Sequence, residues 1–487
     1  MDQRRYHEVA WVRDNVDPSA LRYLLEYKSL KESDQIYRMA TRLAVFEVRY
    51  FRPLEKEEYR IYVDPETGQV FGYRRLLDDN APGASLSPEQ AQTLAARSVE
   101  EHGYHLSGFD LQSSEVEKRK AREDYTLVWQ AKAGDPRNVA DAHYRLEADV
   151  AGDQVVGFAR SFKLPEAWER ERRASSLVNT ALSVVGKLVG LALVGAGVVL
   201  LVIRIRSGQI AWRAAAKVGA LTLALMVLSE LNQWSGLDRQ YDTSLPFSTW
   251  RLFEVISLIV VPLLAGLLCW LLVGLAASLY PEAWQLLRGS ARRLWRRDAV
   301  VCIVLALAVA AGLDKLGELF ASHFHALAPV STEIFPGMLN TTFPGAGFFL
   351  RALAWSIIYA SGLGAAVYVI RLGWTKRAWW LWAGILLVLI GLGPAAAHSP
   401  REFFAGWVMD FVPLAVGVAL LFWFFRDNLL AYWGAAFCLQ VAQPLVSLLS
   451  QQARFYWSNG LLLALLAFLF LAWLFFGGRS GEVQNEP

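Results

Sequence analysis

The pattern of apolar positions changes near residue 175. Before that point, short segments alternate between apolar and polar residues, whereas the rest is dominated by runs such as "LVGLALVGAGVVLLVI". Alternation at a period of two predicts half-buried strands, and a run of about 20 apolar residues predicts a helix that crosses the bilayer. The pattern predicts a soluble α+β domain at 1–175, a multi-helix transmembrane domain at 176–480 and a polar tail at 481–487.

The second half of the chain contains nine runs that come close to the length of a membrane span. They lie near 177–203, 214–231, 252–279, 299–320, 346–371, 378–397, 403–425, 429–450 and 460–477. The expected fold is therefore an α-helical polytopic membrane bundle of about nine transmembrane helices, preceded by the α+β domain.

Basic residues gather in alternate loops of this half. One set of loops holds Arg204, Arg206, Arg213, Lys217, Arg288, Arg292, Arg293, Arg296, Arg297, Arg371, Lys376, Arg377, Arg426 and Arg479, and the opposite set holds fewer. The positive-inside rule then places the C-terminus in the cytoplasm and, with an odd helix count, the N-terminal domain outside. "EAWERERR" argues against this assignment, because its three arginines precede the first span on the outer side.

Two segments of the soluble domain resemble each other. "YRIYVDPETGQVFGYRR" at 59–75 and "YRLEADVAGDQVVGFAR" at 144–160 both alternate around a turn that contains glycine. Each segment predicts a β-hairpin, and together they predict an internal repeat in which every hairpin has a helix on one face. "LSPEQAQTLAARSVEEHGY" supplies that helix for the second copy, with Ser87 as the N-cap.

The helix that should precede the first hairpin is hard to find, and the chain begins without an apolar export segment. Two explanations remain open. Either an upstream helix is missing from the recorded chain, or the domain is cytoplasmic and one membrane helix has been miscounted. The incomplete first copy favours a missing beginning.

Composition agrees with a membrane protein, because 54% of the residues are hydrophobic and the formal net charge is only +3. Such a small basic excess gives no argument for nucleic-acid binding. Cys269, Cys302 and Cys438 are isolated in apolar runs, so neither a disulfide framework nor a cysteine metal site is expected.

Ionisable residues inside membrane spans are the first candidates for function. Asp410 lies about ten residues into its span, near mid-bilayer depth; it is either functional or hydrogen-bonded to a neighbouring helix. Asp314 and Glu318 share one helix face near the end of a span, where a solvated pair is the preferred interpretation. His323 and His325 alternate in a way that matches no zinc signature and favours a loop.

His398 lies in "HSPRE", just before a predicted helix. Ser399 can be the N-cap, Pro400 the first helical residue and Glu402 the third, which is the pattern of a capping box. His398 then lies outside the helix at the membrane surface. Its spacing from Glu402 also allows metal ligation, but the capping role explains the glutamate better.

Taken whole, the chain resembles the large bacterial forms of the CPBP family of intramembrane proteases, the CAAX-protease and bacteriocin-processing family. The resemblance is carried by "VRYFRPLEKEEYRIYVDPETGQVFGYRRLLDDNAPGASLSPEQA" and "YRLEADVAGDQVVGFARSFKLPEAWERE", and more loosely by "YDTSLPF" and "RFYWSNGLLLALLAFLF". It implies two PepSY-like hairpin and helix repeats, a location in the bacterial plasma membrane, and zinc in an active enzyme.

The catalytic motifs of the resembled family are degenerate here. If Arg371 matches the arginine of the Glu-Glu-x-x-x-Arg motif, Ala366 and Val367 occupy the positions of the two glutamates. His398 matches the histidine of the second motif, with Pro394 at its aromatic position. Water activation needs the missing groups, so the resemblance implies a protein without a functional catalytic set and without a cofactor.

Three functions therefore compete. The first is a catalytically inactive relative that binds lipids, membrane peptides or other membrane proteins. The second is an active metalloprotease in which His398 and Asp410 act as substitute catalytic residues, joined by Asp314 or Glu318, with zinc bound. The third is a sensor or transporter in which the repeat domain signals to the helices.

Overall fold

The computed structural model describes residues 6–174, 177–281, 293–327, 330, 337–377, 379–392 and 397–476. The chain divides into two compact units. The first, the sheet unit, joins Met1–Ala174 with Gly236–Glu254 and Phe320–Asn340; the second, the helix unit, contains the other residues. The sheet unit thus also takes in two segments from the membrane half of the chain.

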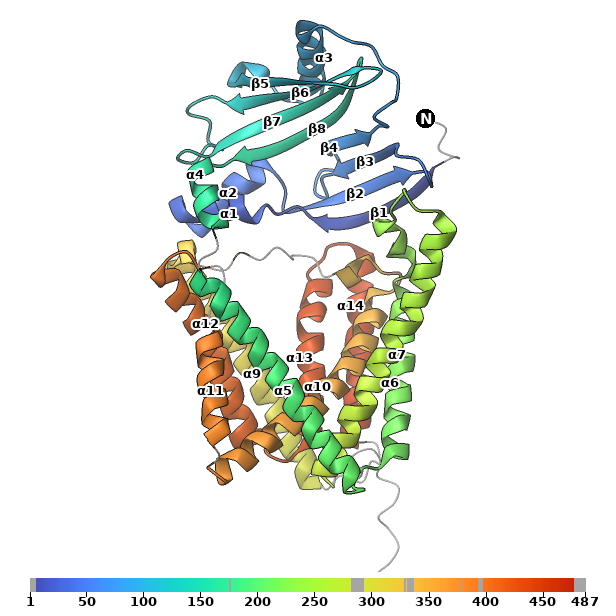
Figure 1. The fold of residues 1–487 in the computed structure, drawn as a ribbon, viewed down its shortest axis with the longest axis vertical. Coiled ribbons are helices and arrows are strands. Elements are labelled where there is room, and N and C mark those ends of the chain that lie inside the picture. The colour runs from blue at the N-terminus through green and yellow to red at the C-terminus, as the bar shows by residue number, and fades with distance from the viewer. Residues whose placement is uncertain are drawn as a thin grey trace, which may run out of the picture. The chain divides into compact units, whose positions relative to one another are not determined.

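The sheet unit is built on one eight-stranded antiparallel sheet with the order β1-β2-β3-β4-β8-β7-β6-β5 (Figure 1). The strands are β1 (His7–Asp14), β2 (Ala44–Phe51), β3 (Glu58–Val63), β4 (Val70–Leu76), β5 (Phe109–Lys118), β6 (Glu123–Ala131), β7 (His143–Ala151) and β8 (Gln154–Lys163). Each half of the sheet is a meander of four consecutive strands. The halves meet where β4 pairs with β8, through Tyr73 with Phe158 and Arg74 with Gly157.

Both predicted hairpins are present, as β3–β4 and β7–β8. The alternating pattern has the expected consequence in β7, where Tyr144, Leu146, Ala148 and Val150 are all buried. Gly152, in the turn before β8, has a φ of +61°, a left-handed conformation that favours glycine. Alternation and turn chemistry were therefore sufficient to locate these elements.

Helix α3 (Pro88–Glu101) covers the second half of the sheet. Ala91, Ala95 and Val99 are fully buried in the core that this helix shares with β6, β7 and β8. Its start is as predicted, because the Ser87 side chain accepts a hydrogen bond from the backbone of Gln90. Small side chains on this face allow the helix to approach the sheet closely.

The first hairpin has no packed helix of its own among the described residues, so the expectation of one helix on each hairpin holds only for the second. Helices α1 (Pro18–Tyr27) and α2 (Leu30–Ala40) instead form a separate core that contains Val139, Ala142 and Leu164. α4 (Glu166–Arg173) then ends the continuous part of this unit.

The helix unit contains, in its described part, eight helices long and apolar enough to cross a membrane. They are α5 (Leu177–Arg206), α6 (Trp212–Asn232), α7 (Phe247–Leu279), α9 (Arg293–His323), α10 (Pro344–Thr375), α12 (Pro400–Leu420), α13 (Leu429–Leu449) and α14 (Arg454–Phe476). The protein is thus a multi-pass membrane protein by length and composition. The span expected at 378–397 is a shorter helix, α11 (Trp379–Gly391), while residues 393–396 lie outside the described part.

α11 runs antiparallel to α5, against which it packs. Its beginning lies at the end of α10, where the Trp382 and Trp374 ring centroids are 5.3 Å apart. Its end lies beside the first third of α5, because a Cβ added to Gly391 would be 3.3 Å from the Cα of Gly186. The 13 residues of α11 rise about 20 Å, so this short helix covers much of a hydrocarbon core of about 30 Å.

Candidate functional site

The helix start expected after His398 is present. The hydroxyl of Ser399 accepts a hydrogen bond from the Glu402 backbone at 3.1 Å, and Pro400 is the first residue of α12. The Glu402 carboxylate accepts its bond from the backbone N–H of His398, at 2.8 Å, one residue before the partner that a capping box predicts. Glu402 therefore has a structural partner, and the bond depends on the backbone of His398.

The imidazole of His398 lies beside the same carboxylate. Its Nδ1 is 3.8 Å from Oε2 of Glu402, and both side chains are mostly buried. Asp410 is exposed on α12, ten residues beyond Pro400, which corresponds to a rise of about 15 Å. His398 precedes α12 and Asp410 lies within it, at different levels along the helix axis, so a single metal or water cannot contact both.

The acidic pair of α9 is divided between two partners. Asp314 accepts a hydrogen bond from Gln443 at 3.5 Å, whereas Glu318 forms an ion pair with Lys315 at 2.5 Å. Between them, Gly317 faces α12: a Cβ added there would lie 3.8 Å from Cε of Met409. These two helices are therefore neighbours near Asp410, although each acid of α9 is bonded elsewhere.

The two histidines near the end of α9 lie in different local structures. His323 is the last residue of α9, and its Nδ1 lies 3.1 Å from the hydroxyl of Ser322. His325 begins a short 3-10 turn, as the expectation of a loop requires.

The residues at the positions of the resembled family's first motif also have other contacts. Arg371 forms an ion pair with Asp427 at 2.7 Å and donates to the Phe422 carbonyl at 3.2 Å. Ala366 and Val367 are helical residues of α10, and Pro394 lies outside the described residues. Within the described ranges, no three His, Cys, Asp or Glu side chains gather closely enough to hold a metal, so these residues do not fit a zinc centre.

A different arrangement joins the sheet to the loop between α6 and α7. Arg49 of β2 and Glu58 of β3 form an almost fully buried ion pair, with Nε and Oε2 2.8 Å apart. The same guanidinium donates to the Tyr241 carbonyl at 2.8 Å. Leu54 adds a backbone bond to the carbonyl of Thr243 at 2.9 Å.

Aromatic side chains pack together where the sheet contacts the loop between α6 and α7. Tyr241 is buried with Val9 and Phe51, and its ring centroid lies 5.1 Å from those of both Phe51 and Phe247. A buried charge pair is tolerated only when its remaining hydrogen-bonding groups are satisfied. The Tyr241 carbonyl accepts a hydrogen bond from Arg49, so the loop between α6 and α7 satisfies a buried charged group of the sheet.

The loop between α9 and α10 is held at the edge of the sheet. The Asn340 side-chain amide bonds both to the N–H and to the C=O of Val12 in edge strand β1, each at 2.9 Å. Arg22 of α1 donates to the carbonyl of Ala326 at 2.9 Å. An edge strand exposes unpaired backbone groups, and Asn340 pairs two of them.

Burial on this face changes the acidity of Glu47. The side chain is buried on β2, with Arg13 at 3.2 Å and Arg60 at 3.6 Å. Burial raises the pKa of the Glu47 carboxyl above its usual value, although the neighbouring arginines oppose the rise.

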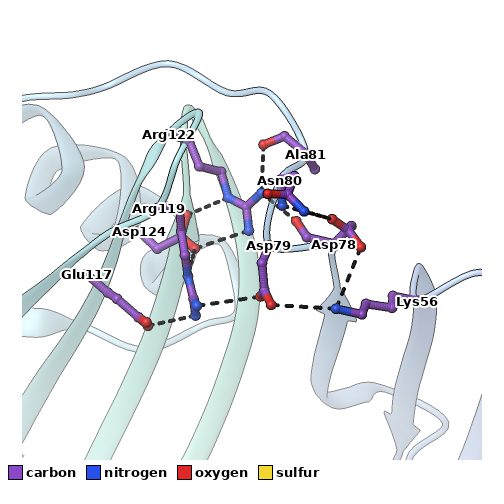
Figure 2. A network of polar contacts seen from close by, with 9 residues as sticks. All are labelled: Lys56, Asp78, Asp79, Asn80, Ala81, Glu117, Arg119, Arg122 and Asp124. Carbon is purple, nitrogen blue, oxygen red and sulfur yellow. Dashed lines mark hydrogen bonds and ion pairs between the residues drawn. The ribbon is translucent and has the colours of Figure 1, made fainter.

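A second polar network is centred on Arg122 (Figure 2). This buried guanidinium donates to the carbonyls of Asp78 and Ala81, at 2.8 and 2.7 Å, and pairs with Asp124 at 2.7 Å. Arg119 adds a contact to Asp79 at 3.5 Å. These bonds fix the connection between β4 and α3 against the β5–β6 turn, which is a structural role.

Sequence reasoning missed the junction of the sheet with the loops. The alternating charges of "FEVRYF" and "KEEYRIY" were a signal, because charged residues on a strand face need a partner when that face is covered. The residues that cover this face, such as Tyr241, lie almost 200 positions away in the sequence. No local pattern indicates such a contact.

Comparison with known proteins gives no relative: no family model, curated protein or solved structure matches the chain.

Proposed function

We propose that this is a non-catalytic, multi-pass membrane protein in which the sheet unit binds a partner and regulates the helix unit. The proposal combines the resemblance to CPBP-family proteases with loss of their catalytic groups. It rests mainly on one observation: the sheet shares a compact unit with Gly236–Glu254 and Phe320–Asn340. The first segment contains the loop after α6 and the first turns of α7, and the second contains the last turn of α9 and the loop that follows it, so a change in the sheet passes to those helices through the chain.

The same observation supports the proposed orientation. The two loop segments belong to the same compact unit as the sheet, which favours a topology with all of them on one side of the membrane. Two long helices separate each segment from the next, as this requires. With the distribution of basic loops, we place the sheet unit outside the cytoplasm and the C-terminus inside, in the plasma membrane of a bacterium.

The coupling is tested by hydrogen exchange on the full chain in lipid nanodiscs. Arg49→Met should increase amide exchange in the sheet, in the loop at residues 236–246 and in the first turns of α7. Arg97→Met is the matched control, because Arg97 forms an exposed ion pair with Glu101 on α3. An increase confined to β2 and β3 in the Arg49 variant would refute transmission through the loop.

An active protease remains the alternative, supported by the approach of α9 to α12 beside Asp410. Incubation of the protein with membrane peptides in liposomes separates the two functions. We expect no cleavage, and the same result for His398→Ala. Cleavage that is lost in His398→Ala or Asp410→Asn, together with one bound zinc per chain, would establish the protease instead.

A further inference from the structure

The helix unit contains an apolar cavity of about 410 Å³, lined by residues of α6, α7, α10, α13 and α14. Its floor is buried: Ile357 and Ser361 of α10 are only 8% and 7% exposed. Its rim is open, because Leu221 of α6 and Trp473 of α14 are 51% and 57% exposed. The exposed rim residues belong to α6 and α14, which both pack against α10. The cavity therefore opens sideways between these two helices.

The cavity lies toward one end of the spans. Its lining includes Val218 and Leu221 from the first turns of α6, and Phe470 and Trp473 from the last turns of α14. This is the end of α6 that is distant from loop 236–254. An apolar cavity of this size suits a small apolar ligand or one hydrocarbon chain. In a bilayer, the hydrocarbon that reaches a sideways opening is a lipid acyl chain.

Two cations lie beside the opening. Arg213, Lys217 and Leu221 are spaced four residues apart on α6, so they share one helix face. Along the helix axis, Lys217 is about 6 Å and Arg213 about 12 Å from Leu221, both toward the N-terminal end of α6. Both cations are exposed, and neither forms a hydrogen bond or ion pair within the described residues. Arg204 and Arg371, by contrast, are bonded to Tyr368 and Asp427.

We propose that this site binds one anionic phospholipid of the bilayer leaflet at that end of the helices. One acyl chain occupies the cavity, and Arg213 and Lys217 hold the phosphate at the membrane surface. The order along α6 matches the order of groups in a phospholipid, with charge at the surface and hydrocarbon deeper. Basic clusters beside membrane helices are typical sites for anionic lipid headgroups.

Native mass spectrometry tests the proposal on the full chain exchanged into equal phosphatidylglycerol and phosphatidylethanolamine. The wild type should retain one phosphatidylglycerol under conditions that remove the other lipids. Arg213→Gln with Lys217→Gln should lower retention about tenfold. Arg206→Gln with Lys376→Gln removes two exposed cations, one at the end of α5 and one just after α10, and should leave retention unchanged.

The acyl chain needs a separate variant. Ala277→Phe fills the cavity and should abolish retention; Leu221→Trp narrows its rim and serves the same purpose if the first variant does not fold. Neither inorganic phosphate nor a dibutanoyl phosphatidylglycerol should compete. Equal retention of both headgroups, or unchanged retention in both cavity variants, would overturn the site. Loss of phosphatidylglycerol retention in the charge variant alone would show that only electrostatic attraction at the surface holds the lipid, and would overturn the acyl-chain site.

Discussion

Arg49 and Glu58 form a buried ion pair whose guanidinium also donates to the Tyr241 carbonyl in the loop between α6 and α7. Removing one partner of a buried pair costs about 3–5 kcal/mol, because the other charge remains buried. We expect Arg49→Met to lower the free energy of unfolding by about 3 kcal/mol, since Arg60 still pairs with Glu58. Denaturant unfolding followed by tryptophan fluorescence measures the change.

A double variant separates charge from packing. Arg49→Met with Glu58→Leu should recover most of that loss, because no uncompensated carboxylate remains. Arg38→Met is the surface control: its pair with Asp34 is exposed, and the expected cost is under about 0.5 kcal/mol. A double variant as unstable as the single one would show that the Tyr241 contact, not the charge pair, dominates.

Glu47 should make stability depend on pH. Because burial raises its pKa in the folded protein, the folded state holds the proton more tightly than the unfolded chain. This contribution is complete below the unfolded value of about 4.3 and is lost as pH rises through the folded pKa. Glu47→Gln should therefore flatten the decrease in melting temperature above pH 4.3. A steeper decrease in the variant would contradict the raised pKa.

The N-terminus of α12 allows a prediction about His398. Ser399→Ala removes the oxygen that accepts from Glu402 and should cost about 1 kcal/mol. His398→Ala keeps the backbone N–H that donates to Glu402, so its cost should be smaller. Thermal unfolding of both variants in one detergent gives the comparison. A larger loss for His398→Ala would show that its imidazole contributes more than the cap.

Cysteine labelling tests the membrane topology. Cysteines at Ser85, Ser244 and Ser450 should react with an impermeant maleimide in intact cells, whereas cysteines at Gln209 and Lys376 should be protected. All five residues are exposed. Lysed cells provide the control, because all five cysteines should then react. If Ser450 is protected while Ser85 reacts, α11 does not cross the membrane and the number of crossings is eight.

The sequence by itself determined the local elements and the class of protein. Alternation located the β3–β4 and β7–β8 hairpins, and long apolar runs located the membrane helices, because both signals come from burial along a regular backbone. Ser87 and Ser399 marked helix starts for the same local reason, since an N-cap bonds to amides two or three residues away.

Only the tertiary structure decided which distant segments complete one another. Tyr241 and Asn340 belong to loops of the membrane half, yet their polar groups pair with Arg49 and Val12 of the sheet. It also separated His398 from Asp410, because His398 precedes α12 and Asp410 lies about 15 Å along it, although the hypothesis of substitute catalytic residues had placed both in one site. Such relationships depend on the three-dimensional path of the chain and on groups that only folding brings within hydrogen-bond distance, so no local pattern contains them.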